Sequence, residues 1–114
     1  MKTLKLQMSH EKVFPSDLVP IKNVDDEKVQ AAERFAVEEH NRRGGHHFIY
    51  KRVVNGLSNP NIDAEPKYYI LVIKAINDNN IAWSYIVKVQ YHWILRIAPF
   101  LFSFEDVLKD FDKH

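Results

Sequence analysis

The clearest pattern along the chain lies between residues 25 and 45, where apolar side chains recur at the spacing of an α-helix. The apolar positions that share one side of that helix are Val29, Ala32, Phe35 and Ala36. Most charged positions fall on the remaining surface, and these are Glu33, Arg34, Glu38 and Arg42. The pattern therefore predicts a long amphipathic helix with one face in a core.

Both ends of this segment carry residues that usually begin and end a helix. Asp25 or Asp26 can cap the start, because a side-chain oxygen there accepts hydrogen bonds from backbone N–H groups that lack a partner within the helix. Arg42 and Arg43 suit the negative end of the helix dipole, and Gly44-Gly45 is a stop signal. We therefore expect the helix to lie between these caps.

Beyond residue 46 the repeat shortens to two, which is typical of strands. The segments rich in β-branched and aromatic residues are 47–54, 68–75 and 81–91, and 104–111 reads as a last strand or a short helix. The links between them are short, and short links favour antiparallel neighbours because parallel pairs need a long crossover. The order of elements predicts an α+β fold.

Turn residues separate the predicted strands. Asn55-Gly56 and Asn59-Pro60-Asn61 follow the first strand, and Asn77-Asp78-Asn79-Asn80 follows the second. We interpret Asn55-Gly56 as a turn that needs positive φ angles. Pro99 cannot donate to a β-ladder, so it predicts a break ahead of the last element.

Length and composition limit the classes of protein to which the chain can belong. With 114 residues it is long enough for one core, and we expect an extended N-terminal arm over residues 1–17 and a single domain over residues 18–114. The net charge of +1 argues against a nucleic-acid partner. No apolar run reaches the roughly 18–20 residues of a spanning helix, so we expect no membrane partner either.

The residues that usually carry catalysis or metal binding show no suitable spacing. The chain has no cysteine, which excludes disulfides, thiolate ligands and a cysteine nucleophile. Among the histidines, His46 and His47 are adjacent and would point to opposite faces of a strand. Neither His40 nor His92 completes a ligand set of the usual spacing. We therefore predict no metal, no cofactor and no catalytic residue.

One motif resembles a known family. Residues 34–41, which read Arg-Phe-Ala-Val-Glu-Glu-His-Asn, are similar to the helix signature of plant cystatins. Further segments that resemble this family are Pro20-Ile21-Lys22-Asn23, Arg52-Val53-Val54, 68–75, 85–89 and 103–108. The resemblance implies a cystatin-like α+β fold, in which one long helix packs across a four- to five-stranded antiparallel sheet.

The same resemblance implies a function. Plant cystatins are thiol protease inhibitors, and they block papain-like cysteine proteases with a wedge made of an N-terminal arm and two hairpin loops. On this chain the wedge would consist of the arm residues Asp17 and Leu18, the first-loop residues Asn55, Gly56, Leu57 and Ser58, and the second-loop residues His92, Trp93, Pro99 and Phe100. The family's usual motifs are absent from all three places, so the resemblance carries over the frame rather than the contact residues.

Other interpretations remain open at this stage. The frame can serve as a binding module, natural or engineered, for a different protein such as an aspartic protease.

The apolar tip formed by Trp93, Ile94, Leu95, Ile97 and Phe100 is either a binding surface or an ordinary strand with one face in the core. The apolar segment 81–102 can also favour self-association, since a long apolar edge strand invites pairing. A secreted and a cytoplasmic location are equally compatible with the sequence.

Overall fold

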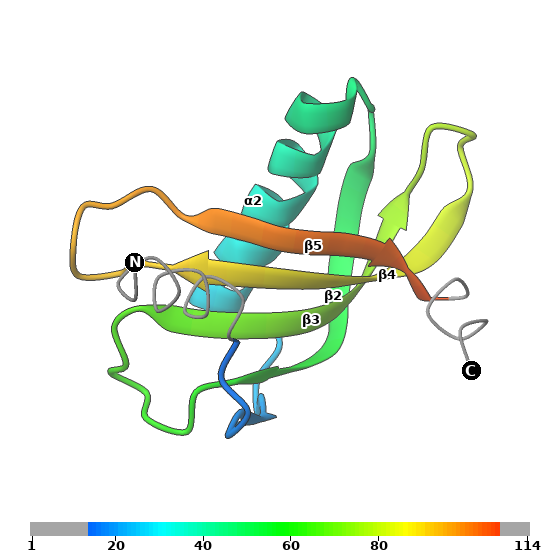
Figure 1. The fold of residues 1–114 in the computed structure, drawn as a ribbon. Coiled ribbons are helices and arrows are strands. Elements are labelled where there is room, and N and C mark those ends of the chain that lie inside the picture. The colour runs from blue at the N-terminus through cyan, green and yellow to red at the C-terminus, as the bar shows by residue number, and fades with distance from the viewer. Residues whose placement is uncertain (1–13, 108–114) are drawn as a thin grey trace, which may run out of the picture.

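The computed structural model describes residues 14–107 and shows one helix packed on one face of a five-stranded antiparallel sheet (Figure 1). The strands follow one another across the sheet in chain order, from β1 to β5. The elements are β1 (Val19–Pro20), α2 (Glu27–Gly44), β2 (Ile49–Ser58), β3 (Lys67–Ile76), β4 (Ala82–Tyr91) and β5 (Phe100–Asp106). The predicted α+β class, with one helix on an antiparallel sheet, is therefore confirmed.

The helix ends are those that the sequence indicates. The Asp26 side chain accepts a hydrogen bond from the Lys28 backbone N–H at 2.8 Å, so Asp26 is the N-cap. Gly45 closes the other end with a φ of 67°, in the left-handed region that favours glycine. One position differs from the prediction: Glu33 is completely buried, although the spacing assigned it to the polar surface.

The core forms where the buried face of α2 meets alternate residues of the sheet. Leu71 of β3 pairs with Val87 of β4, and both side chains are fully buried on the helix side. The other buried apolar residues of β3 and β4 are Tyr69, Ile73, Ala75, Tyr85 and Val89. Strict alternation along both strands places this set on one face, as a period of two requires.

The turn predicted at Asn55-Gly56 is wrong. Both residues lie inside β2, where Asn55 pairs with Val72 and Gly56 with Leu71. A Cβ on Gly56 would come within 2.7 Å of the Ile70 carbonyl oxygen, so the glycine serves a close backbone approach rather than a positive φ. The link to β3 is therefore the segment 59–66.

The C-terminal part of the sheet also departs from the prediction. The strand expected at 81–91 is confirmed as β4, but residues 93–97 belong to no strand. The last strand is β5, which begins at Phe100 instead of 104, and residues 108–111 lie outside the described part of the chain. Because β4 lies between β3 and β5, the segment 81–102 is not the single edge strand that the self-association hypothesis required.

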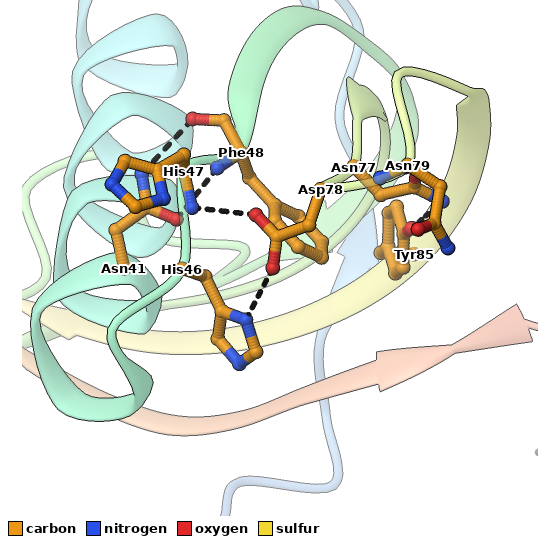
Figure 2. A network of polar contacts seen from close by, with 8 residues as sticks. All are labelled: Asn41, His46, His47, Phe48, Asn77, Asp78, Asn79 and Tyr85. Atoms are coloured by element: carbon orange, nitrogen blue, oxygen red, sulfur yellow. Dashed lines mark hydrogen bonds and ion pairs between the residues drawn. The ribbon is translucent and has the colours of Figure 1, made fainter.

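Hydrogen bonds attach the C-terminal end of α2 to the β3–β4 turn (Figure 2). The Asp78 carboxylate accepts from the His47 backbone N–H at 2.6 Å, and its other oxygen lies 2.6 Å from His46 Nδ1. These two contacts lower the pKa of Asp78. The Asn41 side chain bonds both the N–H and the carbonyl of Phe48, each at 2.9 Å. This end of the molecule is thereby fixed, and the turn predicted at 77–80 is confirmed.

Within residues 14–107, no helix combines the length and the apolar character needed to cross a bilayer.

Candidate functional site

Two connecting segments meet at the end of the sheet opposite the β3–β4 turn (Figure 1). They are the β2–β3 segment, residues 59–66, and the β4–β5 segment, residues 92–99, which we call together the loop end. They share this end because alternate turns of an antiparallel meander lie on the same side. Its exposed apolar residues, with their exposed fractions, are Ile62 (76%), Ile94 (70%), Leu95 (52%) and Ile97 (52%).

One carboxylate joins the two segments of the loop end. Glu65, in the β2–β3 segment, accepts hydrogen bonds from the backbone N–H groups of Trp93, Ile94 and Leu95 at 3.0, 3.3 and 3.1 Å. His92 Nδ1 lies 3.2 Å from the same carboxylate. All four partners belong to the β4–β5 segment, so a single side chain fixes one loop against the other.

The surroundings of Glu65 keep its carboxylate charged. Its side chain is 14% exposed, and this burial raises the pKa. The three backbone N–H groups and the His92 contact act in the opposite direction and outweigh burial, so the pKa of Glu65 lies below its ordinary value of 4.5. The bonded form is therefore the ionised form.

Trp93 anchors the loop end to the core. Its ring stacks on Tyr91 with the centroids 4.0 Å apart, and its Nε1 donates to the Tyr69 hydroxyl at 3.0 Å. The Lys28 ammonium lies 5.4 Å from the ring centroid. Trp93 was predicted to contact a protease; in this structure its side chain is half-buried and packs against the core, next in the chain to the exposed Ile94 and Leu95.

The N-terminal segment reaches the same end of the sheet. Val19 pairs with Ser58, the last residue of β2, so Asp17 and Leu18 lie next to the start of the β2–β3 segment. Asp17 is exposed and Leu18 is half-buried. Further back, the Phe14 ring packs edge-on against Tyr68 at 5.0 Å.

A groove of about 780 Å³ opens beside this junction. Its walls come from the β1 segment, the start of α2 and the β2–β3 segment, and Ile62 contributes to them. The groove adds a recess to the apolar surface of the loop end. Asp17, Leu18 and the two connecting segments therefore lie at one end of the sheet, whereas residues 1–13 of the expected arm lie outside the described part of the chain.

The candidate residues within those segments need correction. Asn55, Gly56, Leu57 and Ser58 are strand residues rather than a loop tip. Ser58 is buried, and its hydroxyl donates to the Tyr68 carbonyl at 3.0 Å.

His92 and Pro99 of the second segment are half-buried, and Phe100, which the structure places at the start of β5, is 48% exposed. Sequence reasoning missed Ile62 and Glu65. The signal for Ile62 was one apolar residue within an Asn- and Asp-rich link, and Glu65 offered no local signal, because its partners are 27 or more residues away.

Histidines do not assemble into a metal centre in the described part of the chain. No group of three or more His, Cys, Asp or Glu side chains lies close enough there to hold a metal ion. His40 instead stacks on Phe104, with ring centroids 3.8 Å apart, and burial lowers its pKa.

Comparison with known families decides between the inhibitor classes left open by the sequence. The family model that matches is SQAPI, aspartic acid proteinase inhibitor, and it covers residues 21–107, well over half of the chain. The chain belongs to this inhibitor family. No curated protein and no solved structure gives a significant match.

The SQAPI match overturns the plant cystatin assignment, because no cystatin family matches. Residues of the motif at 34–41 pack the helix against the sheet, which explains why the motif led to the wrong family. Ala36 and Val37 are buried against the sheet, and Asn41 bonds Phe48. These positions hold a helix on a sheet and carry no information about the protease that is bound. The inhibitor class therefore stands, and the family match favours an aspartic protease over a papain-like target.

Proposed function

We propose that this protein inhibits aspartic proteases by inserting the loop end into the substrate cleft of the enzyme. Family membership supports the target class. The observation that carries the mode of binding is the exposure of Ile62, Ile94, Leu95 and Ile97 on two segments tied together by Glu65. Burying such side chains contributes about 25 cal/mol per Å² of apolar area before the costs of association.

The tie between the two segments favours inhibition over cleavage. A protease hydrolyses a segment that it can draw into an extended shape, whereas residues 93–95 are bonded to Glu65 in a non-strand conformation. Because the free protein already holds these residues in place, less conformational entropy is lost on binding. A pre-organised loop end therefore combines affinity with resistance to hydrolysis.

The direct test is a titration of pepsin, as a representative aspartic protease, and of papain with the full chain. We expect inhibition of pepsin, and expect Ile94→Lys to weaken it by tenfold or more, as for an apolar contact at the centre of an interface. The matched control is Ile49→Lys, because Ile49 is 57% exposed on β2 and lies outside the loop end.

Two results would contradict the proposal. The target class fails if a panel of aspartic proteases stays fully active at micromolar inhibitor while papain is blocked. The binding surface fails if Ile94→Lys and Ile49→Lys inhibit equally well.

A further inference from the structure

Glu65 has a bonding pattern that packing alone does not require. Its two carboxylate oxygens face three successive backbone N–H groups, those of residues 93–95. Successive N–H groups aimed at one point form a site for an anion, and here the anion is supplied by the protein itself. The residues that it orders include Ile94 and Leu95, two of the exposed apolar residues of the loop end.

We propose that Glu65 is a positioning residue for inhibition: its ionised carboxylate holds residues 93–95 in the shape that meets the protease, and protonation of that carboxylate releases them. Acid therefore sets the lower limit of the pH range in which the protein inhibits. The inference rests on the function proposed above and adds a regulating group to the same surface.

The sign of the pH effect follows from the side chains around Glu65. His92 from the β4–β5 segment is the titratable side chain in contact with it, and His92 is 11% exposed. Tyr69 of β3 and Lys28 of α2 contact the neighbouring Trp93 ring rather than the carboxylate. Lys67, the first residue of β3, donates from its Nζ to the Ile62 carbonyl at 3.0 Å rather than to Glu65. We call the bonds between Glu65 and the N–H groups of residues 93–95 the clamp. The loss of the clamp in acid comes from protonation of Glu65, whose charged oxygens accept these bonds.

The acidic pKa values of the catalytic carboxyl groups in an aspartic protease bear directly on the pKa that Glu65 needs. An aspartic protease works with two carboxyl groups that share one proton, with apparent pKa values of about 1.5 and 4.7 in pepsin. A carboxyl group with an ordinary pKa of 4.5 is largely protonated across much of that range. An inhibitor whose binding loop depends on a carboxylate therefore benefits from a lowered pKa, and the N–H groups of residues 93–95 lower the pKa of Glu65.

The test measures the loop and the inhibition separately. In the free full-length protein, the amide NMR signals of residues 93–95 are followed from pH 7 to pH 2, and they should titrate together below pH 4.5, with the midpoint of the Glu65 carboxyl. In parallel, the inhibition constant against pepsin is measured at several pH values. We expect Glu65→Gln to weaken inhibition about tenfold at pH 4.5, because the amide offers one acceptor oxygen where the carboxylate offers two.

The acid-side loss of inhibition should then flatten in the Glu65→Gln variant, which has no group to protonate at this position. The matched control is Glu105→Gln on β5, an exposed carboxylate outside the loop end, which should keep both the inhibition constant and the pH profile of the parent. A structural role alone would lower stability without flattening the pH profile.

Each outcome bears on one of the two proposals. If the amide signals of residues 93–95 do not titrate with Glu65, the proposed release of these residues on protonation is wrong, whether or not pepsin is inhibited. Equal inhibition by the parent and Glu65→Gln at every pH overturns the positioning role. If the parent inhibits no aspartic protease but the amide signals follow Glu65, the proposed function fails and the pH-dependent clamp stands.

Discussion

Replacement of the buried carboxyl group on α2 should stabilise the protein at neutral pH. Both oxygens of Glu33 are buried without a hydrogen-bond partner in the described part of the chain. Burial raises the pKa of Glu33 to about 7, and the nearby Arg34 offsets this only in part. Relative to the ordinary value of 4.5, the shift is about 2.5 units, which corresponds to about 3 kcal/mol at 1.36 kcal/mol per unit.

The direction follows from proton linkage. In the unfolded chain Glu33 ionises near pH 4.5, whereas in the folded protein it keeps its proton until about pH 7. The folded state is therefore favoured most below pH 4.5, and about 3 kcal/mol of stability is lost as the pH rises from 4.5 past 7. Glu33→Gln removes the ionisation, so the variant should gain stability over the parent as the pH rises.

The assay is urea unfolding followed by Trp fluorescence at pH 3.5, 5.5 and 8. The difference in unfolding free energy between Glu33→Gln and the parent should grow by about 3 kcal/mol between the first and last pH. Glu38→Gln, an exposed position on the same helix, is the matched control and should show no such trend. Parallel stability curves for Glu33→Gln and the parent would refute the reasoning, because they would mean that Glu33 titrates alike in both states.

Three further substitutions probe the sheet, the end of the helix and the loop anchor. Gly56→Ala should destabilise the protein by about 1–3 kcal/mol, because its Cβ would lie 2.7 Å from the Ile70 carbonyl oxygen. Gly45→Ala has open space and should cost only the left-handed backbone strain of about 1 kcal/mol, so a lower melting temperature for Gly45→Ala than for Gly56→Ala would contradict this account. Trp93→Phe should lower the unfolding free energy by about 1 kcal/mol through loss of the bond to Tyr69, with little change in inhibition. Lost inhibition at unchanged stability would instead indicate direct contact of Trp93 with the protease.

Local patterns were sufficient to predict the frame. The helix boundaries depend on Asp26 and Gly45, whose effects are confined to neighbouring backbone groups, and both are confirmed. The strand at 68–75 alternates between two faces, and the sheet preserves that alternation in β3. Such features involve residues within a few positions of each other, so one sequence contains the information needed to place them.

The errors occurred where distant residues decide the outcome. Asn55-Gly56 favours a turn when only neighbours are considered, but pairing with Val72 and Leu71 extends β2 through it. The helical spacing assigned Glu33 to the polar surface, but in the folded protein its side chain is completely buried.

At the candidate site, the sequence indicated the arm and the second segment but could not place Glu65 against residues 93–95. The target class was also beyond local analysis, because the motif at 34–41 reports helix packing.

The bond between Glu65 and the facing segment also limits how the protein can change over evolution or in the laboratory. A residue inserted into 59–64 would displace Glu65, and the N–H groups of residues 93–95 would then lose their acceptor. The sequences of the two loops therefore have to change together. A library that randomises both loops together and retains the carboxylate samples new specificities. A library that lengthens a single loop samples mainly variants in which the bonds between Glu65 and residues 93–95 are lost.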